Sequence, residues 1–260
     1  MSMRKLAMIT GASSGIGREI ATLAAADGYD LMLAADEPCV DAAAGLRAEG
    51  IEIQSVVADL ATAAGVEKLL ACASGRAVDV LVANAGHGLG RGFLDQDAEQ
   101  WRHVIDTNIT GTLLLLQPLL KQMVARGEGR VLITGSIAGH LAGSFQAVYN
   151  GTKAFIDSFA AAIGNELQDT GVTITCLKPG ATDTNFFARA GMLDTKVGQA
   201  KKDDPADVAV TGWEAMKAGE HAVVHGLKNK AQVLAAGVLS EAATAAMHRK
   251  QAEPGSGNSD

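Results

Sequence analysis

Short apolar runs alternate with Ala-rich helical segments along most of this chain. The runs have few polar interruptions, and several are rich in β-branched residues, as buried strands are. They lie at Leu6 to Thr10, Asp30 to Ala35, Ile51 to Ala58, Val78 to Ala83, Arg130 to Thr134, Val172 to Leu177 and His221 to His225. Candidate helices lie between them, at about Gly15 to Asp27, Val40 to Glu49, Ala63 to Ser74, Ala98 to Arg126, Val148 to Asp169 and Pro205 to Ala218. This alternation predicts an α/β fold with a doubly wound, seven-stranded parallel sheet that has helices on both faces.

The length and composition indicate one domain. With 260 residues, of which 48% are hydrophobic, the chain can bury a large core. We expect a single domain over residues 1–250 and a flexible tail over residues 251–260, where Pro, Gly, Ser and Asn gather. The net charge of -7 argues against a nucleic-acid partner, because no basic stripe exists to neutralise phosphates.

Cysteine spacing and hydropathy favour a protein of the reducing cytoplasm. Cys39, Cys72 and Cys176 are widely spaced and form no CxxC pair, so neither a disulfide framework nor a metal site is indicated. The apolar run Leu113 to Leu116 is far shorter than a membrane span, and no targeting segment is evident. We therefore expect a cytoplasmic protein that has no membrane segment and no metal.

A glycine-rich turn follows the first predicted strand directly and leads into a helix. It reads Thr10-Gly11-Ala12-Ser13-Ser14-Gly15-Ile16-Gly17. Glycines let the backbone turn tightly and approach a pyrophosphate, whose charge is met by free amides and the dipole at the helix N-terminus. The spacing TGxxxGxG departs from the commoner GxGxxG, and a simple turn is the alternative. The strand before it and the helix after it favour dinucleotide binding.

The end of the second predicted strand favours NAD over NADP. It reads Ala34-Ala35-Asp36-Glu37, without a basic residue. A carboxylate at this point accepts hydrogen bonds from ribose hydroxyls and repels a 2′-phosphate. Alternatively, Asp36 caps the following helix.

Tyr149 and Lys153 lie four residues apart in the apolar segment Val148 to Phe159, which puts a phenol and an ammonium on the same face of one helix. A free tyrosine has a pKa of about 10, and a neighbouring cation lowers this pKa, so that the phenol can exchange a proton with an alcohol or a carbonyl. Taken alone, the same spacing also fits a surface helix whose Tyr packs and whose Lys is solvated. Motifs elsewhere in the chain decide between the two interpretations.

Together these motifs resemble those of the classical short-chain dehydrogenases/reductases. They occur in the family's order over about Leu6 to Leu227, and they comprise Thr10 to Gly17, Asp59 after the third strand, Asn84-Ala85-Gly86 after the fourth, Asn108, Ser136, Tyr149-x-x-x-Lys153, and Pro179-Gly180 after the sixth. Ser136 precedes Tyr149 by thirteen residues, the usual spacing in the family. Two mild departures are Ala83, where the family commonly has Asn, and Thr182, where Val or Ile is frequent.

The resemblance implies a Rossmann-type fold and hydride transfer between NAD(P) and a secondary alcohol or ketone of a small apolar substrate. Tyr149 would be the general acid in carbonyl reduction and the base in alcohol oxidation, with Lys153 lowering its pKa and holding the nicotinamide ribose. Ser136 would hydrogen-bond the substrate oxygen. Asn108 would hold a water that links Lys153 to solvent.

The resemblance also implies a set of cofactor contacts. Asp59 would contact adenine, Asn84 the adenosine side, and Thr182 and Thr184 the carboxamide and phosphate region. The threonines are alternatively helix N-caps. Besides Tyr149 and Lys153, the expected cofactor contacts are Gly11, Ser13, Ser14, Gly15, Ile16, Gly17, Asp36, Asp59, Leu60, Asn84, Ala85, Gly86, Pro179, Gly180, Thr182 and Thr184.

Substrate recognition is expected in three variable segments, His87 to Arg91, His140 to Phe145 and Thr184 to Lys202. The last contains Phe186 and Phe187 ahead of a charged run. It is either an apolar lid over the nicotinamide or a loop that its phenylalanines anchor to the domain.

Three functions from different classes remain open. The first is an NAD(P)-dependent alcohol dehydrogenase or carbonyl reductase, the second a cofactor-binding regulatory protein without turnover, and the third a related epimerase or dehydratase that uses the same Tyr and Lys. The intact set of catalytic residues favours turnover. Sugar-nucleotide epimerases usually have a longer substrate domain and a TGxxGxxG turn, neither of which is present.

A homodimer or homotetramer is expected. The segment Ala98 to Arg126 offers more apolar surface than one face of a sheet needs. The family resemblance implies that this helix and the Tyr149 helix pack against symmetry mates.

Overall fold

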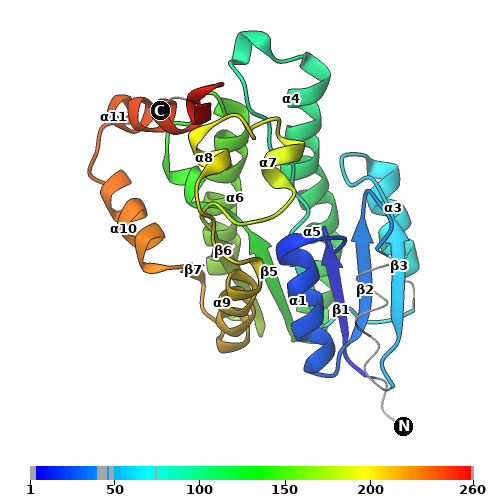
Figure 1. Ribbon diagram of the computed structural model, residues 1–260. Helices are drawn as coiled ribbons and strands as arrows, with labels where there is room; N and C mark the ends of the chain where they lie inside the picture. Colours follow the sequence, from blue (N-terminus) through cyan, green and yellow to red (C-terminus); the bar gives the residue numbers. More distant parts are fainter. Residues whose placement is uncertain (1–3, 40–45, 47–49, 74, 259–260) are drawn as a thin grey trace.

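Seven parallel strands form the centre of the computed structural model, which describes residues 4–39, 46, 50–73 and 75–258 (Figure 1). The strand order is β3-β2-β1-β4-β5-β6-β7, and every pairing is parallel. The strands are β1 (Leu6–Thr10), β2 (Asp30–Ala35), β3 (Ile53–Val57), β4 (Val80–Ala83), β5 (Gly129–Thr134), β6 (Val172–Lys178) and β7 (Ala222–Val224). The predicted doubly wound, Rossmann-type sheet is confirmed, and each of its strands overlaps the apolar run that predicts it.

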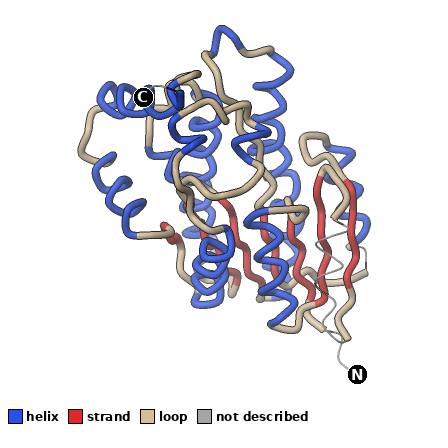
Figure 2. The backbone as a smooth tube through the Cα atoms, viewed as in Figure 1, coloured by secondary structure: helices blue, strands red, loops and turns tan. Residues whose placement is uncertain are grey.

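Helices cover both faces of the sheet (Figure 2). They are α1 (Gly15–Ala26), α3 (Ala63–Cys72), α4 (Ala98–Ile105), α5 (Thr112–Arg126), α6 (Ala147–Glu166), α7 (Phe186–Arg189), α8 (Lys196–Gln199), α9 (Pro205–Ala218), α10 (Leu227–Ala236) and α11 (Glu241–Ala252). The helix predicted over Val40 to Glu49 lies outside the described residues apart from Leu46.

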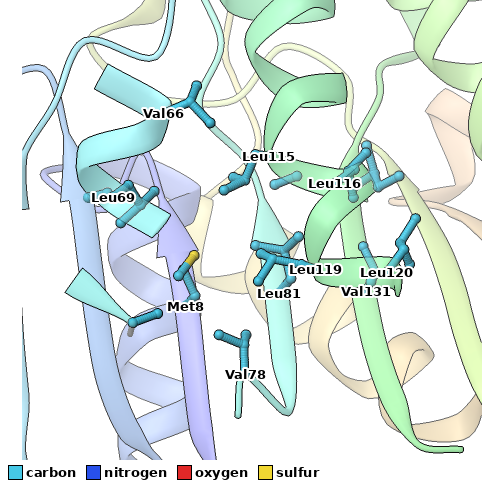
Figure 3. Packing of buried hydrophobic residues seen from close by; sticks show 14 of the residues in the cluster. Met8, Val66, Leu69, Val78, Leu81, Leu115, Leu116, Leu119, Leu120 and Val131 are labelled. Carbon is cyan, nitrogen blue, oxygen red and sulfur yellow. The ribbon is translucent and has the colours of Figure 1, made fainter. Parts of the chain in front are cut away.

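Alternate side chains of the central strands face two separate cores, as the period of two in a strand requires. Met8 and Leu81 belong to the core beneath α3, α5 and α6, of which Figure 3 shows a part. Their neighbours Ile9 and Val82 belong to the opposite core, beneath α1 and α9. Burial on both faces explains why these strands are apolar throughout rather than alternating with polar residues.

The segment predicted as one helix over Ala98 to Arg126 is divided. A single π-helical stretch, Asp106–Gly111, separates α4 from α5. At its end, Gly111 packs so closely on the carbonyl of Leu60 that a side chain there would overlap it. Such a stretch shifts the register of the helix, and here it carries the buried Asn108.

The C-terminal part contains two helices that the strand and helix pattern does not predict, α10 and α11. Contacts with the rest of the chain continue beyond them, because Gly255 N–H donates to Asp194 Oδ2 over 3.0 Å and Gly257 N–H to the Asp194 carbonyl over 2.9 Å. The mobility expected for residues 251–260 stays a prediction. Within the described residues, no helix combines the length and the apolar character that crossing a bilayer requires.

Candidate active site

The glycine-rich turn joins the end of β1 to the start of α1. Gly15 has φ +55°, and a Cβ there would lie 2.6 Å from Thr184 Cγ2, so both the backbone and the space require glycine. The first turn of α1 has no acidic residue, and Ser14 makes no side-chain cap. The amides at this helix N-terminus therefore remain available to an anionic group.

One cavity of about 780 Å³ connects this turn to Tyr149. The predicted site residues that line it are Gly11, Ser13, Ser14, Gly15, Ile16, Asp36, Asp59, Leu60, Asn84, Ala85, Gly86, Ser136, Tyr149, Lys153, Pro179, Gly180, Thr182 and Thr184. Gly17 and Asn108 are not among the lining residues. Gly17 instead lies against the carbonyl of Gly11 and the amide of Asn84, where a Cβ would overlap both.

Asn84 ties together the ends of three strands beside this turn. Its Nδ2 donates to the carbonyl of Thr10 over 3.1 Å, and its Oδ1 accepts from Thr134 Oγ1 over 3.0 Å. Its backbone N–H donates to Thr10 Oγ1 over 2.9 Å. Asn84 therefore holds the carboxyl ends of β1, β4 and β5 in register at the edge where open α/β sheets bind ligands.

Asp36 is already paired with a cation of the segment 184–202. Arg189, at the end of α7, forms an ion pair with it, in which Nη2 donates to Oδ2 and Nη1 lies 3.4 Å from Oδ1. Burial raises the pKa of Asp36, but the hydrogen bond and charge of Arg189 outweigh it, so the net pKa is lowered. Both side chains remain more than two-fifths exposed, which makes the pair weak enough to exchange for another partner.

Tyr149 and Ser136 line the same cavity. Ser136 caps the short 3₁₀ turn Ile137–His140 by accepting from Ala138 N–H over 3.1 Å, and its hydroxyl donates to the carbonyl of Pro179 over 3.4 Å. Burial raises the pKa of Tyr149 to about 12, and the Ser136 hydroxyl offsets only part of that rise. The phenol is therefore protonated at neutral pH, as a general acid for carbonyl reduction must be.

Lys153 is buried one turn beyond Tyr149 on α6. Its Nζ donates to the carbonyl of Thr134 over 2.8 Å and lies 5.9 Å from the centre of the Tyr149 ring. The net pKa shift of Tyr149 is opposite to the lowering expected from a neighbouring cation, because burial of the phenol dominates. Burial lowers the pKa of Lys153 itself, against the charge of Asp157.

Asn108 holds the chain after β4 against α6. Its Oδ1 accepts from His87 N–H over 2.8 Å, while its Nδ2 donates to the His87 carbonyl over 3.0 Å and to Thr152 Oγ1 over 2.9 Å. These three bonds occupy both ends of the amide. The water-holding role that the family resemblance implies stays a prediction.

A buried polar cluster that the motifs do not reveal lies behind the Tyr149 helix. Asp157, one turn beyond Lys153, has its Oδ2 3.4 Å from both His140 Nε2 and Lys178 Nζ, and it accepts from Cys176 Sγ over 3.5 Å. Gly135 leaves room for this carboxylate, since a Cβ there would overlap Oδ1. The negative charge of Asp157 raises the pKa values of both Tyr149 and Lys153.

In the alcohol oxidation that the family resemblance implies, Asp157→Asn is expected to move the rise of activity with pH to lower pH. A negative charge disfavours the phenolate, so removing it lowers the pKa of Tyr149, and the Lys178 charge left unpaired acts in the same direction. The measurement is kcat/KM for oxidation against pH at saturating cofactor. Glu166→Gln, an exposed acid on the same helix, is the matched control and should leave the profile in place. A shift toward higher pH would contradict this role for Asp157.

Two of the predicted substrate segments pack against each other beside Tyr149. The Phe186 ring lies 5.1 Å from the Tyr149 ring and covers Gly88, where a Cβ would lie 2.3 Å from Phe186 Cζ. Gly90 N–H donates to the Ala190 carbonyl over 2.9 Å. Phe187 and Met192 are buried in a small separate apolar cluster. The segment 184–202 is therefore anchored by Phe187, while Phe186 covers Tyr149. The anchored-loop interpretation fits Phe187, and the apolar-lid interpretation fits Phe186.

Metal ligation has no visible basis in the part of the chain that the structure describes. No group of three or more His, Cys, Asp or Glu side chains is placed there to hold an ion. The three cysteines are free.

Comparison with known proteins identifies the family. The model of the short chain dehydrogenases matches residues 5–192. An uncharacterized oxidoreductase of Staphylococcus aureus (strain MW2) is 31% identical over 225 residues, which is 85% of this chain and 94% of that protein. The chain belongs to the short-chain dehydrogenase/reductase family.

Solved structures agree with this assignment. A short-chain dehydrogenase from Sphingobium yanoikuyae, in complex with NADPH, superposes with a TM-score of 0.80 at 27% identity and covers 92% of this chain and 97% of that one. A short-chain dehydrogenase/reductase from Burkholderia phymatum, in complex with NAD, has a TM-score of 0.78 at 25% identity, over 89% and 92% of the two chains. These two similar proteins were thus solved with different cofactors.

Proposed function

We propose that this protein is an NAD(P)-dependent oxidoreductase that interconverts a secondary alcohol and a ketone of a small apolar substrate, with Tyr149 as the acid and base. The observation that carries the proposal is that Tyr149, Ser136 and Lys153 line the same cavity as the glycine-rich turn. The cofactor-bound relatives support the dinucleotide. The residues fit it, since the amides at the start of α1, the close-packed Gly11 and Gly15, and the Asp36 carboxylate all line this cavity.

The proposed roles follow from the chemistry of each side chain. When bound, the dinucleotide supplies or accepts the hydride. Tyr149 gives its proton to the substrate oxygen in reduction and removes it in oxidation, and the Ser136 hydroxyl stabilises negative charge on that oxygen. Lys153 places a positive charge beside the phenol, which favours the phenolate that oxidation requires.

A test of this function is the absorbance of reduced nicotinamide during incubation with a panel of alcohols and ketones. We expect turnover with at least one class of secondary alcohol or ketone and with NAD(H) preferred. Dinucleotide binding without any turnover across the panel would favour a regulatory protein instead. We further propose a cytoplasmic protein, consistent with its free thiols.

We expect the protein to form a homodimer or homotetramer through α5 and α6. Although Leu115 and Leu116 are buried in the core, Leu114 on α5 is 43% exposed and Phe155 on α6 is 40% exposed. Phe155 stacks on Phe159, with 6.0 Å between the ring centres, and this gives a flat aromatic surface that a second copy can cover.

Light scattering after size-exclusion chromatography measures this assembly. Phe155→Asp is expected to lower the molar mass of the assembly, because the new charge would be buried in the interface between copies. Leu94→Asp is the matched control, since Leu94 is exposed but belongs to the separate 3₁₀ turn Phe93–Asp95. A wild-type monomer at micromolar concentration would contradict the expectation.

A further inference from the structure

The cavity continues beyond Tyr149 to the two C-terminal helices, α10 and α11. Its walls in this half combine apolar side chains, among them Leu141, Phe186, Leu239 and Met247, with polar ones such as Gln232 and His248. Helix α10 lies against the 3₁₀ turn that directly follows Ser136, and Asn229 of α10 packs against Gly180. This half of the cavity therefore adjoins the reacting groups rather than the glycine-rich turn.

Three lysines from separate segments line this half. Lys201 follows α8, Lys228 belongs to α10 and Lys250 to α11. Among the described residues, none of the three has an ion pair or a hydrogen-bond partner for its ammonium group. The neighbouring Lys202 differs, because its Nζ donates to the Gly198 carbonyl over 2.7 Å.

The acidic lining residues lie at the other end. Only Asp36 and Asp59 among the described lining residues are acidic, and they follow β2 and β3, on the adenosine side. The substrate half thus combines apolar and polar walls with positive charges that no described residue pairs. Low-dielectric walls strengthen the field of such charges on a ligand between them.

We propose that the substrate is an apolar alcohol or ketone that carries an anionic group, such as a carboxylate, away from the reacting carbon. The apolar body lies along the walls beside Phe186, and the anion lies among Lys201, Lys228 and Lys250. The inference rests on the proposed function and specifies its substrate class. Each exposed lysine contributes little alone, so the three together are expected to give a preference of about tenfold for the anion over a neutral analogue.

Calorimetric binding of octanoate and its neutral analogue octanamide to the cofactor-loaded protein tests the charge without requiring turnover. Octanoate is expected to bind about tenfold more tightly, with a preference that falls as salt is raised. The double variant Lys228→Ala/Lys250→Ala should remove the preference. Lys230→Ala is the matched control, because Lys230 is exposed on the same helix but does not line the cavity.

Turnover of oxo fatty acids and aryl oxo acids, each beside its methyl ester, tests the substrate class. The acids are expected to have the higher kcat/KM, mainly through KM, and the double variant should equalise acid and ester. Equal or better binding of octanamide, or equal or better use of the esters, would overturn the proposal. A double variant that weakens cofactor binding and leaves the acid preference unchanged would also overturn it, because the lysines would then serve the dinucleotide. Lysine-dependent octanoate binding without turnover of any alcohol or ketone would count against the oxidoreductase function alone.

Discussion

Tyr149→Phe is expected to lower kcat by about 10² to 10⁴-fold, the usual contribution of general acid–base catalysis, while dinucleotide affinity stays within a few fold. The change removes only the ionisable hydroxyl. The ring that packs 5.1 Å from Phe186 is kept, so the shape of the cavity should persist. Steady-state rates and a cofactor titration measure the two effects separately.

The chain offers a matched control, because its only other tyrosine is Tyr29. That ring packs edge-on against Trp213, with 5.9 Å between the centres, and neither residue lines the cavity. Tyr29→Phe is expected to leave kcat and KM unchanged. Activity of the Tyr149→Phe variant within a few fold of wild type would remove Tyr149 from the acid/base role and revive the regulatory interpretation.

Local pattern was sufficient to predict the sheet because each strand carries its own signal. The strands β1 and β2 have the predicted bounds, since their apolar runs are bordered by the glycine-rich turn and by polar residues. The division of the predicted helix over Ala98 to Arg126 has no such signal. At the end of the dividing stretch, Gly111 packs against Leu60, a contact between distant segments that periodicity does not record.

Prediction of the site was limited in the same way. The motifs locate the residues that meet at the carboxyl ends of the strands, and the structure brings all but Gly17 and Asn108 to one cavity. The ion pair of Asp36 with Arg189 joins residues 153 positions apart, and no spacing predicts it. Asp157 lies one helical turn beyond Lys153, so its place on the same helix face was readable from the sequence. The sequence does not show that the Asp157 carboxylate is buried against Lys178.

The ion pair with Arg189 changes the physical basis of cofactor choice. An ionised carboxylate has about four lone-pair sites, so Asp36 can retain Arg189 and still accept hydrogen bonds from the ribose hydroxyls of NAD. The same guanidinium would attract the 2′-phosphate of NADP, against the repulsion from Asp36. Arg189 is therefore expected to weaken the preference for NAD over NADP that Asp36 alone would produce.

Asp36→Arg is expected to reverse the cofactor preference, from NAD(H) in the wild type to NADP(H). Because the pair is partly exposed and screened, a change of about tenfold or more in the ratio of the two kcat/KM values is expected. Arg189→Ala should shift the ratio in the opposite direction, further toward NAD(H), since it removes the cation that a 2′-phosphate would meet. Glu37→Gln is the control, because Glu37 carries the same charge but does not line the cavity.

These variants separate two explanations that wild-type kinetics alone would confuse. If Asp36 governs the choice, its replacement changes the ratio whether or not Arg189 is present. If Arg189 governs it, the wild type prefers NADP(H), and Arg189→Ala abolishes that preference while Asp36→Arg strengthens it. A wild-type preference for NADP(H) would defeat the assignment of NAD. It would also imply that Asp36 positions the Arg189 guanidinium in the absence of cofactor, and that the 2′-phosphate of NADP replaces the carboxylate as the partner of Arg189.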